Sequence, residues 1–281
     1  MTVWKAHLIR EKLIDKSKEM GLRLPQMQML LAQERFLARL FSLDEGRFFI
    51  WKGGSLFIRE YSMLSTPRYT VDVDLLLKGT DFNHTRSILE KACKQSFSDG
   101  FEFSGISVMP MERDTPYGGD RFEVGWTMFG KSQSESLKLD ICSGDVVVPI
   151  LKNFSELSVL SDDGFSVAVN IYPAEFIFAE KLETLFRFGT GNTRCKDLID
   201  LWMLTQVKMA HEGLKLSIEA CFKNRNQNFS SKRLKEIFED VFYVQNMSRM
   251  IKAHFENLKL PSVSVITTAV LEFCFEVMET S

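Results

Sequence analysis

Lys52-Gly53-Gly54-Ser55, followed by Asp72-Val73-Asp74, is the stretch of this 281-residue sequence that decides the fold. Residues 47–51, directly before it, are apolar and aromatic, which predicts a short buried strand. Residues 56–63, directly after the serine, have the pattern of a helix, and the two aspartates lie on a second strand. The stretch therefore predicts a strand, a glycine-serine turn, a helix, and a strand that carries two carboxylates.

The two aspartates are candidate metal ligands. Successive side chains on a strand alternate between its faces, so Asp72 and Asp74 point the same way while Val73 points into the core. Two carboxylates on one face repel each other unless a cation lies between them. Mg²⁺ suits this arrangement, because it is usually bound by one or two carboxylates together with substrate phosphates. We expect Mg²⁺ here, with Mn²⁺ as the alternative.

The residues around the glycines are candidates for binding a triphosphate. Glycine lets the backbone approach an anion closely, and a helix N-terminus offers free N–H groups. Ser55 at the helix start can add its hydroxyl. A purely structural alternative stays open, since a glycine pair is often only a turn and an Asp-x-Asp pattern can occur by chance. The order of the motifs favours a phosphate site; its predicted nucleotide-binding residues are Lys52, Gly54, Ser55, Arg68 and Thr70.

Asp140 is a candidate third carboxylate. Residues 135–142 alternate between polar and apolar, as a half-buried strand should, with Leu137 and Leu139 on one side and Asp140 on the other. On a strand next to the first two aspartates, Asp140 would complete a two-metal site for phosphoryl or nucleotidyl transfer. Its role as metal ligand or general base stays open, and so does the alternative of a solvated strand residue.

Two helices in the second half of the chain carry further candidates. Pro173 suits the first turn of a helix to about Phe188, and Lys181 falls inside the apolar arc of that helix. A lysine there needs a partner, either a structural ion pair or the triphosphate of a nucleotide. A second helix over 196–207 is apolar almost all round and is predicted to be buried.

Two aspartates share one side of that second helix. Asp197 and Asp200 lie three residues apart, and Asp197 falls between apolar positions. Asp200 is expected to be a structural partner of Arg194 or Lys196.

These motifs resemble those of a known family. Gly54-Ser55 followed by Asp72-Val73-Asp74 resembles the signature of DNA polymerase β-like nucleotidyltransferases. With Arg68 and Thr70 added, the pattern resembles the AbiEii/AbiGii toxin-like nucleotidyltransferases. These are the toxin halves of bacterial toxin–antitoxin and phage abortive-infection systems. Residues 179–182 and 194–201 match the same family, and the resemblance runs from the N-terminal helices to about residue 205.

The resemblance implies an α+β fold, with a polymerase β-like nucleotidyltransferase core on a mixed sheet, N-terminal helices and a C-terminal helical domain. The domains expected are 1–165 for the nucleotidyltransferase and 166–281 for the helical part, which contributes Lys181 and Asp197 to the site. The lysine would contact phosphate, and the aspartate would position that lysine or an acceptor hydroxyl. The catalytic residues implied are Asp72, Asp74, Asp140, Lys181 and Asp197.

The function implied is Mg²⁺-dependent transfer of a nucleoside monophosphate from an NTP to an acceptor. The first choice of acceptor is tRNA, and protein hydroxyls and small molecules stay open. A cognate antitoxin protein is the partner that the family resemblance implies. Two alternatives remain: a kinase-like phosphotransferase, and an inhibitory module that binds an NTP without transfer.

Composition sets limits on the class of protein. A hydrophobic content of 45% and a charged content of 26% are ordinary for a soluble globular chain. No apolar run is long enough to cross a membrane, and the N-terminus lacks a secretory segment. The five cysteines are scattered, which argues against a disulfide framework or a zinc site. We therefore expect a cytoplasmic protein without a membrane partner.

The net charge of −2 gives no general case for nucleic-acid binding, although a local basic face is sufficient. Residues 223–235 are one candidate for such a face, with a solvated helix surface as the alternative. Arg187, Arg194 and Lys196 are another, close to the predicted site.

The remaining elements follow from periodicity and turn signals. A turn is predicted at Gly118-Gly119-Asp120. Helices are expected over 6–20, 24–41, 81–97, 231–257 and 263–278, and strands over 101–110, 121–129, 145–150 and 166–171.

Overall fold

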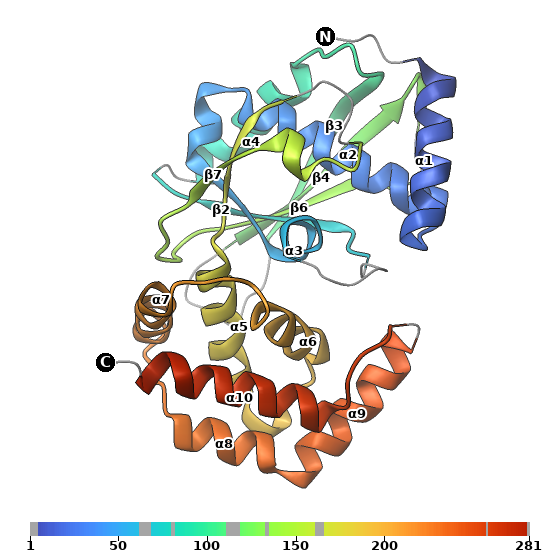
Figure 1. The fold of residues 1–281 in the computed structure, drawn as a ribbon. Helices are drawn as coiled ribbons and strands as arrows, with labels where there is room; N and C mark the ends of the chain where they lie inside the picture. The colour runs from blue at the N-terminus through green and yellow to red at the C-terminus, as the bar shows by residue number, and fades with distance from the viewer. Residues whose placement is uncertain are drawn as a thin grey trace. The chain divides into compact units, whose positions relative to one another are not determined.

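The structure is a computed structural model, and it describes residues 5–61, 69–79, 82–110, 119–132, 135–160, 166–256 and 258–279 (Figure 1). The chain divides into two compact units. The first comprises Met1–Glu60, Ser65–Gly144 and Pro149–Tyr172, and the second comprises Tyr61–Leu64, Asp145–Val148 and Pro173–Ser281. The first unit thus runs to Tyr172, past residue 165, the boundary expected from the sequence.

The first unit is built on one mixed sheet. Among the described residues the sheet has eight strands in the order β3-β4-β6-β2-β1-β8-β7, with β5 paired to β4. β2 pairs with β6 and β1 pairs with β8 in parallel, and the other pairs are antiparallel. The strands are β1 Phe49–Lys52, β2 Asp72–Leu77, β3 Phe101–Pro110, β4 Gly119–Met128, β5 Lys131–Ser132, β6 Leu137–Cys142, β7 Ile150–Asn153 and β8 Ala168–Ile171. This sheet confirms the predicted α+β class.

Helices accompany the sheet in the same unit. They are α1 Ala6–Met20, α2 Leu24–Phe41, α3 Gly53–Glu60 and α4 Phe82–Lys94, with short 3₁₀ helices η1 Asp44–Phe48 and η2 Phe154–Leu157. α1 ends at Gly21, whose φ of 64° is the left-handed conformation that favours glycine at a helix end. α2 packs against α1, α4 and the sheet strands β3, β6 and β8.

The helix α2 is buried along most of its length. The charge of its buried Arg39 has partners. Arg39 donates to both carboxylate oxygens of Asp99, at 2.9 and 2.8 Å, and to the Phe101 carbonyl at 2.9 Å. Sequence periodicity assigns charged residues to the surface, so it does not predict a charged side chain that is buried together with its partners.

The second unit is helical in its described residues. It contains α5 Ala174–Phe188, η3 Gly189–Gly191, α6 Cys195–Leu204, α7 His211–Asn224, α8 Ser231–Glu239, α9 Val241–Phe255 and α10 Val263–Glu279. Edge-to-face aromatic pairs join its helices, with Phe178 to Phe273 at 5.4 Å and Phe186 to Phe222 at 5.2 Å between ring centroids.

Three predicted elements were wrong in detail. The single helix expected over 231–257 is two helices, because Asp240 is extended and caps α9 by accepting from the Tyr243 N–H at 2.7 Å. The strand expected over 145–150 lies at 150–153. Gly119 and Asp120 belong to β4 rather than to a turn, and Gly118 lies outside the described residues. Of the helices that the structure describes, none combines the length and the apolar character that crossing a bilayer requires.

Candidate functional site

A row of four charged residues crosses four neighbouring strands of the sheet, with two carboxylates between two basic side chains. Strand register places Arg121 of β4 opposite Asp140 of β6, Asp140 opposite Asp74 of β2, and Asp74 opposite Lys52 of β1. Residues opposite each other in register point to the same face of a sheet. Two of the three candidate carboxylates are therefore direct neighbours, although they lie 66 positions apart in the sequence.

Asp72 lies on the same face, two residues before Asp74, where its register partner is Lys138. The opposite face of these strands is apolar, with Trp51, Val73, Leu75, Leu139 and Ile141 all fully buried. The local sequence explains the arrangement, because polar and apolar residues alternate along β2 and β6. The structure thus brings Asp72, Asp74 and Asp140 onto one face above a closed core.

Arg121 belongs to this site and was not among the predicted residues. Its Nε donates to Asp140 Oδ1 at 2.7 Å and its Nη2 donates to Asp140 Oδ2 at 2.8 Å. Nη2 also reaches Asp72 Oδ2 at 3.4 Å. The hydrogen bond to Asp140 raises the pKa of Arg121 above its ordinary value, against the opposing effect of burial. A signal was available, since the predicted strands 121–129 and 135–142 are consecutive and pair in antiparallel fashion.

The donor set fits a divalent metal ion at Asp72 and Asp74. Both are partly exposed carboxylates on one face, and hard oxygen donors of this kind suit Mg²⁺. Gly53 leaves the room that Asp74 occupies, since a Cβ on Gly53 would lie 1.9 Å from Asp74 Oδ2. Within the described ranges, no three carboxylate, thiol or imidazole side chains already converge on one point. Both oxygens of Asp140 are held by Arg121.

The glycine-serine segment differs from its predicted form. The helix α3 begins at Gly53 rather than at Leu56, so both glycines lie in its first turn. Ser55 is fully buried, and its Oγ accepts a hydrogen bond from the Trp51 indole at 2.8 Å. Ser55 thus stabilises the connection between β1 and α3. A contact of its hydroxyl with phosphate stays a prediction.

The other predicted nucleotide-binding residues are placed as follows. The Lys52 ammonium lies 4.6 Å from the centre of the Tyr172 ring. The Thr70 carbonyl accepts from Gln33 Nε2 at 3.4 Å, and its neighbour Val71 accepts from the same group at 2.8 Å. Arg68 lies outside the described residues.

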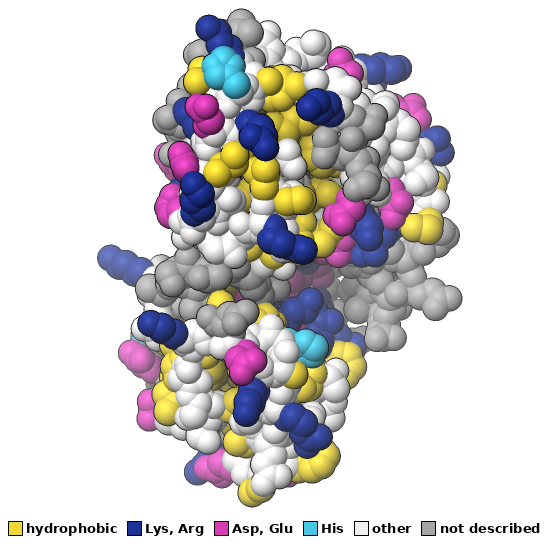
Figure 2. Space-filling view, turned by 90° about the vertical axis from the view of Figure 1, so that its right-hand side faces the viewer, with side chains coloured by type: hydrophobic (Ala, Val, Ile, Leu, Met, Phe, Trp, Pro, Cys, Tyr) yellow, Lys and Arg dark blue, Asp and Glu magenta, His cyan; other side chains and the backbone are white. Residues whose placement is uncertain are grey.

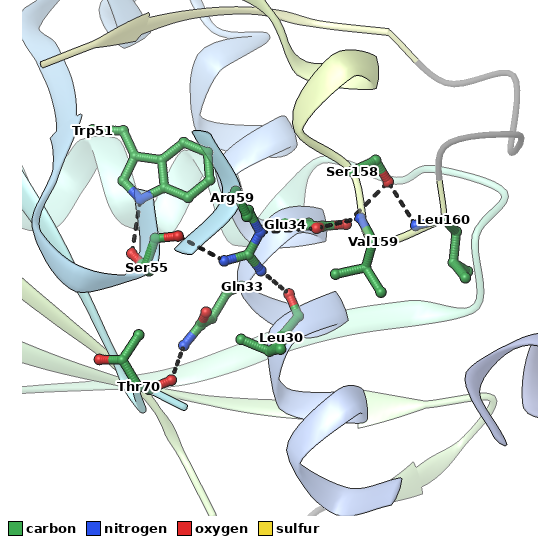
Figure 3. A network of polar contacts seen from close by, with 10 residues as sticks. All are labelled: Leu30, Gln33, Glu34, Trp51, Ser55, Arg59, Thr70, Ser158, Val159 and Leu160. Carbon is green, nitrogen blue, oxygen red and sulfur yellow. Dashed lines mark hydrogen bonds and ion pairs between the residues drawn. The ribbon is translucent and has the colours of Figure 1, made fainter. Parts of the chain in front are cut away.

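A buried polar network holds α3 against α2 (Figure 3). Arg59 of α3 donates to Glu34 at 3.0 Å, to the Ser55 carbonyl at 2.9 Å and to the Leu30 carbonyl at 2.8 Å. Glu34 also accepts from the Val159 N–H at 2.6 Å and from the hydroxyl of Ser158, at 3.1 Å. Burial raises the pKa of Glu34, although Arg59 acts to lower it. The helix α3, which begins with the two glycines, is therefore fixed by a charge pair inside the core.

The second unit holds a separate charge cluster around Lys181. Lys181 Nζ lies 2.8 Å from Asp197 Oδ1 and 2.7 Å from Asp200 Oδ2. Arg194 Nε donates to the other oxygen of Asp197 at 2.5 Å. Burial would raise the pKa of Asp197, but the charges of Lys181 and Arg194 hold it well below its usual range. Lys181 is paired to Asp200 as well as to Asp197, whereas the sequence suggested Arg194 or Lys196 as the partner of Asp200.

One of the two candidate basic faces is weaker than the sequence suggested. Arg225, near the start of the candidate face at residues 223–235, turns inward: it donates to Glu183 at 2.7 Å and lies 3.6 Å from both Glu180 and Asp145. The positive charge of Arg225 is thus paired with carboxylates of the second unit. On the side of the molecule drawn in Figure 2, Lys and Arg side chains are interspersed with Asp and Glu.

Comparison with known proteins gives the chain a family. The family model described as "Nucleotidyl transferase AbiEii toxin, Type IV TA system" matches residues 35–268. That match extends well past residue 205, where the sequence motifs end. No curated protein matches the chain.

A solved structure supports the fold. The crystal structure of JHP933 from Helicobacter pylori is similar over 99% of this chain and 94% of that chain, with a TM-score of 0.51 and 15% sequence identity. At 15% sequence identity, this similarity shows a shared fold and nothing about function. Because the family model covers most of the sequence, this chain belongs to the AbiEii nucleotidyl transferase toxin family of type IV toxin–antitoxin systems.

Proposed function

We propose that this protein transfers a nucleoside monophosphate from an NTP to an acceptor hydroxyl, with Mg²⁺ as its metal ion. The observation that carries the proposal is the placement of Asp74 and Asp140 opposite each other on β2 and β6, with Asp72 on the same face. Membership of a nucleotidyl transferase family supports the general activity. The metal ion, the acceptor and the individual residue roles belong to the proposal.

In the proposed mechanism Asp72 and Asp74 hold the metal ion. When bound, Mg²⁺ would offset the charge of the triphosphate and of the transferring phosphoryl group. The backbone at Gly54 and the N-terminus of α3 bind phosphate oxygens, aided by Lys52. The acceptor oxygen forms a bond to the α-phosphorus while the bond to the pyrophosphate oxygen breaks. Asp140 takes the acceptor proton or adds a further metal ligand.

The second unit supplies a lysine that is already oriented. Lys181 is held between Asp197 and Asp200, so its ammonium group has lost much of its freedom before substrate binds. We assign it to the β and γ phosphates, with Asp197 as its positioning residue. Ser55, Arg68 and Thr70 complete the proposed phosphate contacts. Catalysis by such a site comes mainly from positioning and from charge stabilisation.

The acceptor proposed first is tRNA, and protein hydroxyls or small molecules are the other candidates. Toxin–antitoxin membership implies an antitoxin partner, and we propose a cognate protein that binds this chain. The proposed setting for both is the cytoplasm.

The decisive experiment incubates purified protein with Mg²⁺, total bacterial tRNA and each α-labelled NTP in turn. Asp74→Asn should abolish the transfer of label. Asp120→Asn is the matched control: Asp120 lies opposite Ile141, so it points to the other face of the same sheet. The control should transfer label as the wild type does.

The label also separates the alternatives. Label on tRNA from the α-phosphate supports nucleotidyl transfer, whereas transfer only from a γ-labelled NTP would indicate a kinase. NTP binding by calorimetry without transfer to tRNA, protein or small-molecule acceptors would indicate an inhibitory binding module. Full activity in Asp74→Asn would contradict the proposed site.

A further inference from the structure

Arg121 forms hydrogen bonds to carboxylate oxygens that a metal ion at this site would also bind. Its guanidinium contacts both oxygens of Asp140, at 2.7 and 2.8 Å, and reaches Asp72 at 3.4 Å. Two parallel N–H donors on one carboxylate form the strong, bidentate type of ion pair. A divalent cation beside the same carboxylates would meet both the occupied oxygens and the positive charge of the guanidinium.

Arg121 differs from the arginines that serve the core of this unit. The side chain of Arg121 is 31% exposed, whereas Arg39 is 1% exposed and Arg59 is 5% exposed. An arginine in the core cannot leave its carboxylate without stranding a buried charge, which is costly. Arg121 itself can move into water, and because the Asp140 side chain is only 9% exposed, a metal ion must take the place of the guanidinium when it leaves.

We propose that Arg121 is a built-in competitor of the divalent metal ion and that it sets the metal affinity of the site. In the metal-free protein it offsets part of the repulsion among Asp72, Asp74 and Asp140. When the ion binds, the guanidinium releases Asp140 and turns to solvent, where it is available to an anionic substrate. The inference rests on the proposed function in one respect only, namely that Asp72 and Asp74 bind a divalent ion.

The test measures Mn²⁺ binding, without nucleotide, by the loss of the free-ion signal in electron paramagnetic resonance. Arg121→Gln should bind Mn²⁺ at least about tenfold more tightly than the wild type, which corresponds to about 1.4 kcal/mol. Arg86→Gln is the matched control, because Arg86 also pairs with a carboxylate, Glu90 at 3.0 Å, but on the surface of α4. Its Mn²⁺ affinity should equal that of the wild type.

Further variants separate failure of this inference from failure of the proposed function. Asp74→Asn should lose Mn²⁺ binding whatever the role of Arg121. If Asp74→Asn loses binding while Arg121→Gln binds Mn²⁺ no more tightly than the wild type, the competitor role is overturned and the metal site stands. If neither wild type nor Arg121→Gln binds Mn²⁺, both proposals fail. Circular dichroism in EDTA checks that each variant is folded. Arg121→Lys keeps the positive charge but cannot donate two parallel hydrogen bonds, so its Mn²⁺ affinity should lie between those of the wild type and Arg121→Gln.

Discussion

Gly53 and Asp74 lie so close together that only glycine fits beside the aspartate. A Cβ built on Gly53 would lie 1.9 Å from Asp74 Oδ2 and 2.6 Å from Asp74 Cβ. Gly53 also has a φ of 73°, in the left-handed region that favours glycine. The glycine motif therefore supports the carboxylate motif directly, in addition to any contact it makes with phosphate.

Gly53→Ala should move the Asp74 carboxylate and lower transfer activity by about 10²-fold, because small misplacements of catalytic groups have effects of that order. Gly105→Ala is the matched control. Gly105 has a φ of 69° and no atom within 4 Å of a built Cβ, so it shares the backbone strain without the collision. Both variants should lose about 1–2 kcal/mol of unfolding free energy from that strain. Equal activity in the two variants would contradict the role given to Gly53.

Arg59→Met should destabilise the first unit by about 3–5 kcal/mol, because it leaves the Glu34 carboxylate buried without its main charge partner. The side chains of Glu34 and Arg59 are 0% and 5% exposed. Urea unfolding measures the loss. The exposed pair of Arg86 and Glu90 provides the comparison, where Arg86→Gln should change stability by less than about 1 kcal/mol. A similarly small effect of Arg59→Met would mean that the network does not hold α3.

Lys181→Met should destabilise the second unit by about 3–5 kcal/mol, since it leaves the carboxylates of Asp197 and Asp200 buried side by side. Lys181→Arg keeps the charge, but a planar guanidinium cannot reproduce the compact ammonium group. It should recover most of the stability and little of the transfer activity. If Lys181→Arg recovers both, activity does not depend on the compact ammonium group, which contradicts this prediction.

Asp197→Asn should reduce the loss of unfolding free energy that occurs at acid pH. The pKa of Asp197 in the folded chain lies below its ordinary value of 3.8, so the unfolded chain binds a proton first as pH falls. The stabilisation from the Asp197 carboxylate is thus complete above pH 3.8 and is lost as pH falls through the folded pKa. Urea unfolding at pH 7 and pH 3 should show a smaller difference in Asp197→Asn than in the wild type. An unchanged difference would contradict this ion pair.

Several elements of the candidate site were predictable from local sequence. Alternation along β2 and β6 placed Asp72, Asp74 and Asp140 on the sides of their strands opposite the apolar core residues, because side-chain direction in a strand follows from residue spacing alone. Helical periodicity placed Lys181 on the apolar side of α5, where it needed a partner. Motif order gave the family, which the match over residues 35–268 confirms.

Other features depended on contacts between segments far apart in the chain. The burial of Glu34 with Arg59 leaves no local pattern, because a charged residue looks like surface until its partner is known. The break at Asp240 was missed for a related reason: helical periodicity continues across it, and the capping contact with Tyr243 interrupts the helix.

The sequence alone thus determined the class of fold, the family and the faces on which the candidate catalytic side chains lie, since these follow from spacing and residue type. Only the tertiary structure decided which charges meet. Strand order placed Asp140 opposite Asp74 and Arg121 opposite Asp140. Helix packing placed Arg59 on Glu34 and Lys181 between Asp197 and Asp200. The physical reason is that an ion pair depends on distance in space, which spacing along the chain does not specify.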